Sequence, residues 1–564
     1  MRNILIKNMI KNSQADNLEK NPIIKILQQN KEFIILLAGL GFTLLLHFYQ
    51  NSQAGLWTGE PSTHLTMQLE TVHKLMAHSK DSFSQFIAQF SHLYYKFPKQ
   101  GYDISSTIFS YLVFDVPPTL AEHKIAISKL QLAAFLSCCG ITTYFLRKIF
   151  GWKILLIILI LYATDIYNIV YSSFPRQNIT AHFFSLILIF IYLNKRSKDE
   201  EFNSELALYL GIIAGIGSLF HYSCLEAVFI VVVTELGLML YKRKNIIRAV
   251  SRILIFLGTI VAVWTAGDIF YYLCLHAEIL KPGTKYPILE GMVLAIENTM
   301  INKTPLWKIE GGSLLFSLKY LLQISNPWLL FFSGFGIWRL WADEKLTLKY
   351  CAMLIIGMFM FFLAGSRFFA AARTLEHYMP YFLILAGHGI IQFLSVIKQK
   401  YPKYIPYTLI SIMTVSILTQ LPRIIDAKEA LQGQYKGREY MKDNNIRTIF
   451  LIGRSNSLTN GDIKKINIQQ TYEPICAEVP EANYLYAIRA IPIMKTRSLR
   501  SDEYWKIIEI LEKTKPVIEF PQFNHLPLYY FEFPLKKEIY NRSFPMASMR
   551  RIYKVEDFKK ALCN

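Results

Sequence analysis

Apolar segments recur along the first three quarters of this chain, at about the length that crosses a bilayer. A helix needs about 20 mainly apolar residues to cross about 30 Å of hydrocarbon. The pattern predicts about eleven such spans, near residues 33–49, 130–146, 152–172, 180–194, 207–221, 224–241, 252–274, 324–341, 350–365, 378–396 and 406–421. We therefore expect an α-helical polytopic membrane protein.

Two long connections interrupt the spans, at about residues 50–128 and 275–323. In the first, apolar residues recur at helical spacing from Leu65 to Met76 and again from Phe83 to Tyr94. This spacing predicts two helices. They would lie in the membrane interface, or pack on the span bundle as a lid; both arrangements would cover a site at the outer leaflet.

The two ends of the chain differ from its middle. Residues 1–30 are polar and rich in Lys and Asn, which predicts a cytoplasmic tail rather than a cleaved signal. Residues 31–421 hold the spans. From 422 to 564 the charge rises and no span occurs; helical patterns at 428–443 and 501–513 and strand patterns at 447–452 and 527–533 predict a small α/β domain.

Composition and charge support this division. Hydrophobic residues make up 52% of the chain and charged residues 18%, so much of the chain must face lipid. The net charge of +20 would suggest a nucleic-acid partner in a soluble protein, but lysine and arginine also collect in cytoplasmic loops. We therefore expect no nucleic-acid partner.

The orientation follows from which connections are basic. Every second connection between predicted spans is basic. The basic connections contain Arg147, Lys148 and Lys153; Lys195, Arg196 and Lys198; Lys242, Arg243 and Lys244; Arg339, Lys345 and Lys349; and Lys398, Lys400 and Lys403. The positive-inside rule then places the N-terminus in the cytoplasm. Both long loops and the C-terminal domain would lie outside, in the periplasm if this is a bacterial inner membrane protein.

Cysteine and histidine spacing says little about chemistry. Cys476 and Cys563 both fall in the predicted exterior domain and could form a disulfide in an oxidising compartment. No Cys-x-x-Cys or His-x-x-x-His spacing supports a metal site. We expect neither a metal nor another cofactor.

Several short motifs occur in the order found in one enzyme family. Ile127-Ser128-Lys129 precedes a span that ends in Phe145 to Gly151, and Tyr171 to Arg176 leads into a Phe-rich span. Later come Leu210 to Gly217 and Ala372 to Tyr381. Over residues 33–421 the chain resembles the C-type, lipid-linked-sugar glycosyltransferases, in the branch of the protein O-mannosyltransferases and the aminoarabinose transferase of lipid A.

The resemblance implies transfer of a sugar from a polyprenyl-phosphate donor to a lipid, glycan or protein acceptor on the exterior face. Two positions depart from the family. Its first loop usually carries paired acids, whereas Glu60 follows a glycine, and Gln177 and Asn178 follow Arg176 where relatives often have Asp. A transporter or flippase for lipid-linked saccharides, or a silent glycolipid-binding scaffold, stays an alternative.

Sugar transfer requires a base for the acceptor proton and cations for the departing phosphate. Glu60 is the candidate base, although a carboxylate there could instead stabilise the helix that starts at Pro61. Asp165 and Asp115 are candidate second acids, with Asp103 as a further one. The candidate phosphate-binding cations are Lys129, Arg176, Arg367 and Arg373, although arginines at such positions also snorkel to the membrane surface. Candidate cavity-lining residues are His64, Glu226, Asp268 and His377.

Overall fold

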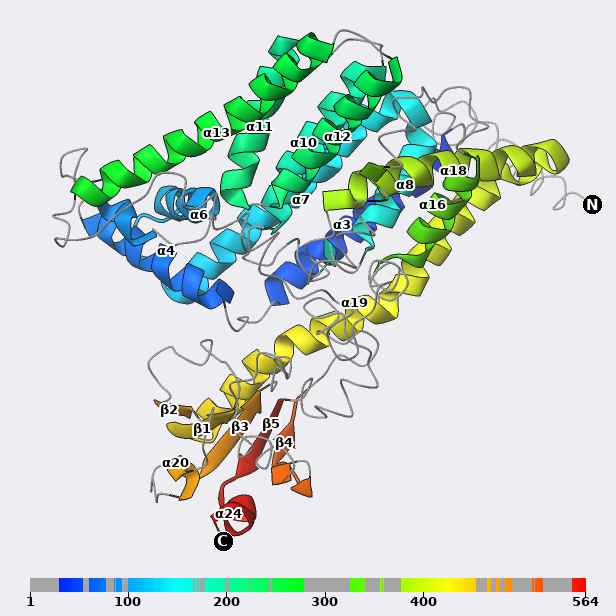
Figure 1. Ribbon diagram of the computed structural model, residues 1–564. Coiled ribbons are helices and arrows are strands. Elements are labelled where there is room, and N and C mark those ends of the chain that lie inside the picture. Colours follow the sequence, from blue (N-terminus) through cyan, green and yellow to red (C-terminus); the bar gives the residue numbers. More distant parts are fainter. Residues whose placement is uncertain are drawn as a thin grey trace, which may run out of the picture.

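A helical bundle and a small C-terminal sheet make up the computed structural model of this chain (Figure 1). The structure describes residues 30–53, 60–77, 86, 88–93, 100–165, 168–169, 172, 178–197, 202–221, 223–242, 246–277, 325–339, 356–357, 359, 377–452, 464–467, 473–476, 482–488, 510–511, 513–520 and 550–563.

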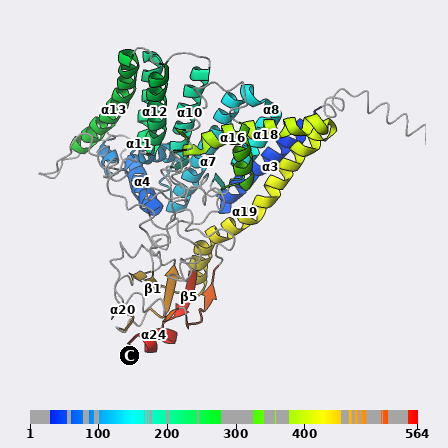
Figure 2. The same cartoon turned by 45° about the vertical axis from the view of Figure 1, so that its right-hand side comes forward.

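Among the described residues, the bundle consists of α-helices and two short 3-10 helices. They are α3 (Lys31–Gln53), α4 (Glu60–Ala77), η1 (Gln89–Leu93), α6 (Gln100–Val113), α7 (Leu120–Phe150), α8 (Trp152–Ala163), α10 (Asn178–Ser197), α11 (Ser204–Phe220), α12 (Cys224–Lys242), α13 (Ile246–Ala277), α16 (Pro327–Arg339), α18 (Met379–Lys400), η6 (Pro402–Tyr404) and α19 (Ile405–Asp443). Figure 2 shows α7, α8 and α10 between α13 on one side and α19 on the other.

Six stretches of the described helices are long and apolar enough to cross a membrane: Lys31–Phe48, Glu122–Phe150, Asn178–Arg196, Ile246–Gly267, Met379–Lys400 and Pro402–Pro422. The chain is thus an integral membrane protein with several apolar helices. The predicted spans 207–221, 224–241 and 324–341 coincide with α11, α12 and α16. The predicted span 350–365 lies outside the described residues except for Ile356, Gly357 and Phe359, so the total of about eleven spans stays a prediction.

The third predicted span ends earlier than the sequence suggests. We expected residues 152–172, but α8 stops at Ala163. The Thr164 hydroxyl donates to the Ile160 carbonyl at 2.7 Å, and the Asp165 amide donates to the Tyr162 carbonyl at 3.2 Å. These bonds close the last turn of α8, and residues 155–163 are all buried. α8 is therefore a short, central helix with apolar contacts on every side.

Residues from several helices meet at one end of the bundle, which we call the loop end. There His47 of α3 bonds to the Ala163 carbonyl at the end of α8, and Tyr162 bonds to His182 near the start of α10. Asn326, just before α16, donates to Thr164, and His377, just before α18, pairs with Ser185 of α10. The loop end therefore collects the ends of α3 and α8 and the starts of α10, α16 and α18.

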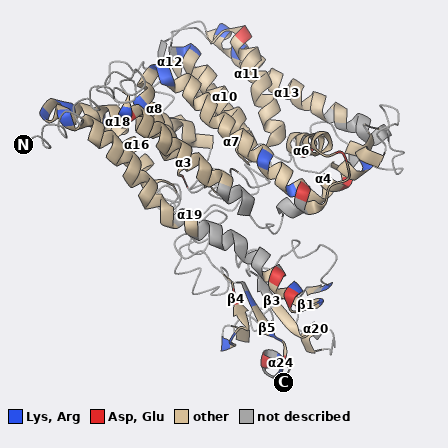
Figure 3. Cartoon of the chain, turned by 180° about the vertical axis from the view of Figure 1, so that it is seen from behind, with Lys and Arg blue, Asp and Glu red and all other residues tan. Residues whose placement is uncertain are grey.

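The opposite end, which we call the basic end, carries cations in the last turns of α7, α10, α16 and α18. Lys153 there pairs with Glu32, joining the first turns of α8 and α3. Figure 3 shows Lys and Arg at the ends of α12 and α18, away from the C-terminal sheet. The basic residues at these helix ends match the alternation predicted from the sequence.

A buried ion pair joins α10 and α12 toward the basic end. Arg196 Nε lies 2.8 Å from Glu235 Oε1, and the Tyr192 hydroxyl donates to the same oxygen at 2.6 Å. All three residues are buried. Charges so far from water persist only when they are paired and hydrogen-bonded, so this triad fixes the packing of α10 on α12.

The helices of the first long loop pack on α7, α11 and α13. α4 packs on α6 and on the first turns of α7, η1 packs on α4 and α13, and α6 also contacts α11. The predicted helix over Leu65–Met76 is confirmed as part of α4, whereas α6 was missed. This packing is the lid arrangement expected from the sequence as one of two possibilities.

The last predicted span and the first predicted helix of the C-terminal domain are one helix. α19 runs from Ile405 to Asp443 through Pro422 without a break and leads into the sheet (Figure 1). The predicted gap between residues 421 and 428 was therefore wrong. The predicted division of the chain at residue 422 falls inside this helix.

The described part of the C-terminal sheet has five strands, β1 (Thr448–Ile452), β2 (Lys464–Asn467), β3 (Tyr484–Ile488), β4 (Ile518–Glu519) and β5 (Arg550–Lys554), in the order β2-β1-β3-β5-β4. β1 pairs parallel with β2 and β3, while β5 pairs antiparallel with β3 and β4. Met441 of α19 packs with Ile449 and Ile552 in the core of this sheet. Strand 447–452 is confirmed; strand 527–533 lies outside the described residues.

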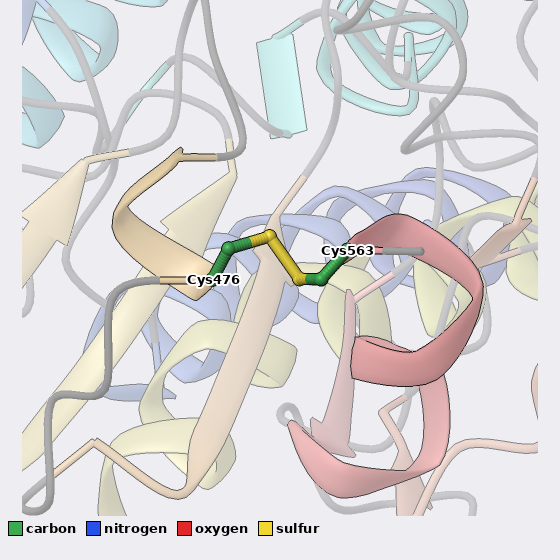
Figure 4. The surroundings of a disulfide bond; sticks show 2 residues. All are labelled: Cys476 and Cys563. Atoms are coloured by element: carbon green, nitrogen blue, oxygen red, sulfur yellow. A yellow bond between two sulfur atoms is a disulfide. The ribbon is translucent and has the colours of Figure 1, made fainter.

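Cys476 and Cys563 form a disulfide (Figure 4). It links α20 (Glu473–Cys476) to α24 (Glu556–Cys563), and 87 residues separate the two cysteines in the sequence. The pairing that the sequence left open is therefore present. It ties the end of the chain to the segment between β2 and β3.

Candidate functional site

A buried carboxylate joins the two lid helices α4 and α6. Both oxygens of Asp103 lie 3.0 Å from Nδ1 of His64, and Gln68 Nε2 donates to Asp103 Oδ1 at 2.7 Å. His64 and Gln68 are four residues apart on α4 and therefore share one face of it. All three side chains are buried, with Gln68 fully enclosed.

The same network reaches α7. His123 Nε2 lies 3.2 Å from Gln68 Oε1, and its Nδ1 lies 2.7 Å from the hydroxyl of Ser110 on α6. A capping box between Thr119 and Glu122 starts α7 immediately before His123. The network therefore fixes three helix segments around one acid, which we call the lid network: His64, Gln68, Asp103, Ser110 and His123.

A second buried acid, Asp165, follows α8 directly. Its carboxylate accepts hydrogen bonds from the hydroxyl of Ser325 and from the amide of Asn326, the latter at 3.2 Å. The Asn326 side chain also donates to Thr164 at 2.8 Å. These contacts hold the start of α16 against the end of α8, and the catalytic role predicted for Asp165 stays a prediction.

A third group of polar side chains lies between α8, α10 and α18. His182 Nε2 lies 3.0 Å from the Tyr162 hydroxyl, and the rings of His182 and His377 are 6.2 Å apart. Glu226, near the start of α12, interacts electrostatically with Tyr378. Burial lowers the pKa of His377 to about 3, so its ring is neutral at physiological pH.

The structure places the predicted acids at different positions. Glu60 is the first residue of α4, one helical turn before His64, and its side chain is outside the described part. Asp115 is exposed between α6 and α7, and Asp165 is buried. The lid network thus includes Asp103 from the predicted acids and His64 from the predicted cavity-lining residues.

The other predicted site residues are spread along the loop end. Lys129 is exposed on α7, Glu226 is half-buried, and His377 is buried. Asp268 is on α13, with a side chain outside the described part. Arg176, Arg367 and Arg373 are outside the described residues altogether, so their predicted contact with a phosphate stays a prediction. Within the described chain, no three His, Cys, Asp or Glu side chains are grouped to hold a metal.

Sequence reasoning missed several site-forming residues, among them Gln68, Ser110, His123 and His182. One signal was available for the first of them: Glu60, His64 and Gln68 recur every four residues and give α4 a polar stripe. Such a stripe beside the apolar one predicts a polar contact along the helix. Nothing in the sequence pairs it with Asp103, which is 39 residues away from His64.

No model of a protein family matches the sequence, and no curated protein matches it. Among solved structures, the chain is similar to the apo oligosaccharyltransferase of Archaeoglobus fulgidus, with a TM-score of 0.49 and 11% identity over 80% of this chain and 69% of that one. It is also similar to ArnT of Cupriavidus metallidurans in the apo state, with a TM-score of 0.47 and 11% identity over 80% of this chain and 92% of that one. ArnT bound to undecaprenyl phosphate gives a TM-score of 0.46 at 12% identity, with the same coverage.

Proposed function

We propose that this chain is a membrane glycosyltransferase that moves a sugar from a polyprenyl-phosphate donor to an acceptor at the loop end. The collinear motifs of the sequence support this class of reaction. The observation that carries the proposal is the lid network, which fixes α4 over the loop end with its first residue, Glu60, one turn from the Asp103–His64 pair.

The reaction requires one proton acceptor and one stabilised leaving group. An acceptor hydroxyl or amine attacks the anomeric carbon, the bond from that carbon to the phosphate oxygen breaks, and the acceptor proton passes to a carboxylate. We assign that carboxylate to Glu60, with Asp103 as the second acid, because this chain has a glycine at residue 59 where the family usually carries paired acids. The lipid phosphate leaves with its electron pair, and Lys129, Arg176, Arg367 and Arg373 are the proposed cations for it.

We place the basic end in the cytoplasm and the loop end outside. The positive-inside rule supports this orientation. The Cys476–Cys563 disulfide supports it as well, because disulfides persist in oxidising compartments such as the periplasm. The C-terminal sheet follows α19 at its loop-end side, since Thr419 of α19 accepts from Trp328 at the start of α16. Donor, acceptor and sheet would then share the exterior face.

The test is bond cleavage by the purified chain in liposomes. The substrate is synthetic undecaprenyl phosphate glucose, with an envelope extract as the source of acceptor, and the measured product is free undecaprenyl phosphate. Transferase activity gives release that depends on both the protein and the extract. Movement of intact donor between leaflets without release would instead identify a flippase and refute the proposal.

A further inference from the structure

Three buried polar side chains near the start of α10 have atoms without a protein partner. Among the described residues, no group hydrogen-bonds Asn178 Oδ1 or Nδ2, His182 Nδ1 or His377 Nε2. Asn178 and His377 are each 2% exposed and His182 is 0% exposed. Buried polar groups in proteins are almost always satisfied, so several such atoms together indicate a ligand that supplies the missing bonds.

These residues form one group rather than scattered exceptions. Asn178, His182 and Ser185 share a face of α10 by their spacing of four and three residues. The rings of His182 and His377 are 6.2 Å apart, and Ser185 lies 3.3 Å from His377 Nδ1. The group lies at the loop end, because α10 begins at Asn178 and α18 begins two residues after His377.

These unpaired atoms include both hydrogen-bond donors and hydrogen-bond acceptors. The Ser185 hydroxyl donates to the Ala181 carbonyl at 3.2 Å, so it accepts from Nδ1 of His377 and leaves Nε2 of that ring with a lone pair. Asn178 offers one acceptor, Oδ1, and one donor, Nδ2. A ligand must therefore both donate and accept here.

This requirement separates a sugar from a phosphate. An ionised phosphate has acceptor oxygens only, and it cannot bond to Asn178 Oδ1 or to the lone pair of His377. Protonation of His377 does not resolve the mismatch, because burial holds its pKa at about 3. Glu226, which interacts electrostatically with Tyr378, the residue after His377, adds a negative charge that opposes an anion. A hydroxyl group donates and accepts at once and fits every one of these atoms.

We infer that Asn178, His182 and His377 form a subsite for the hydroxyl groups of a saccharide, distinct from the group that holds the lipid phosphate. The inference rests on the proposed function, in which that saccharide is the sugar of the lipid-linked donor. The subsite recognises the sugar by neutral hydrogen bonds, while the phosphate binds elsewhere at the loop end.

Binding of two lipids to the full chain in nanodiscs tests the inference. The probes are undecaprenyl phosphate glucose and undecaprenyl phosphate without a sugar. The wild type is expected to bind the sugar-bearing lipid more tightly. Asn178→Leu removes two hydrogen bonds. It is expected to weaken binding of the sugar-bearing lipid about tenfold and to leave binding of the bare lipid unchanged. Thr180→Val, on the opposite face of α10, is the matched control and keeps both affinities.

Three results would overturn the inference. They are equal affinity of the wild type for both lipids, an equal loss of affinity for both lipids in Asn178→Leu, and no loss of affinity for either lipid in Asn178→Leu. Because a buried substitution can disturb folding, deoxyglucose-bearing lipids are measured on the wild type as well. The wild type must bind at least one lipid that lacks a single sugar hydroxyl less tightly than the complete lipid. Unchanged affinity for every deoxyglucose-bearing lipid refutes the subsite. Failure of the proposed function is a separate result, namely no release of undecaprenyl phosphate by the wild type.

Discussion

His64 Nδ1 lies 3.0 Å from both carboxylate oxygens of Asp103, and this contact joins the first turns of α4 and α6. Gln68 and His123 extend it to α7. Hydrophobic packing is not directional. Apolar contacts alone would therefore fix the start of α4 less closely than this contact does. The contact therefore ties the position of Glu60 to that of a buried acid.

Separate and joint replacement of His64 and Asp103 should show that the two side chains act as a pair. Asp103→Leu leaves the His64 and Gln68 donors without a buried acceptor, which costs about 1–3 kcal/mol. His64→Phe should destabilise as well, and the double variant should lose less than the sum of the two. Thermal unfolding in detergent measures all four forms. Additive losses would mean that the two side chains contribute independently.

The α16–α18 contact depends on two glycines. A Cβ on Gly336 would collide with the Leu385 carbonyl, and one on Gly389 would collide with the Phe332 carbonyl. We expect Gly336→Ala to lower the unfolding temperature, because backbone cannot shift as a flexible side chain can. Gly334→Ala on the same helix is the matched control, since a Cβ there meets nothing within 4 Å. Equal unfolding temperatures for the two variants would contradict the packing.

The Cys476–Cys563 disulfide should stabilise the C-terminal sheet. It closes a loop with a sequence separation of 87 residues, and a native disulfide of this kind contributes about 2–4 kcal/mol. Cys476→Ser should therefore lower the unfolding transition of the sheet, while the helical bundle unfolds as in the wild type. Limited proteolysis with and without reductant reports this difference. Unchanged proteolysis after reduction would show that the bond adds no stability.

Glu235→Gln tests the ion pair toward the basic end as a structural feature. It leaves Arg196 buried with a weaker partner, and breaking a buried ion pair costs about 3–5 kcal/mol. We expect lower stability but the same transfer rate per folded molecule, because the pair lies far along α10 from the loop end. Arg196→Met combined with Glu235→Leu should recover stability. A loss of transfer rate in the stable double variant would place this triad in the reaction.

The spans were predictable because length and hydrophobicity alone decide whether a helix can cross a bilayer. Helix α10, for example, agrees with the predicted span at 180–194 to within a few residues. The early end of α8 was not predictable. It depends on Thr164 and Asp165, whose partners Ser325 and Asn326 are about 160 residues away in the sequence.

The candidate site was predictable only in part for the same reason. Asp103 and His64 were each identifiable as polar residues of the first loop, but their pairing depends on how α4 and α6 pack. His377 stood out through its motif, whereas His182 lies in an apolar span pattern and contacts Tyr162 of α8 and His377, which lies just before α18. The strands β2 to β5 were missed because most are short and pair across long stretches of chain.

The rate of sugar transfer by Glu60→Gln tests the account most directly. The glutamine side chain keeps the size and polarity of glutamate but cannot take up the proton that the acceptor substrate loses. General base catalysis contributes about 10²–10⁴-fold, so the account predicts a loss of at least about 100-fold in the release of undecaprenyl phosphate from undecaprenyl phosphate glucose. Glu70→Gln, an exposed glutamate on the same helix, should retain the wild-type rate. A wild-type rate for Glu60→Gln would contradict the assignment of Glu60 as the base.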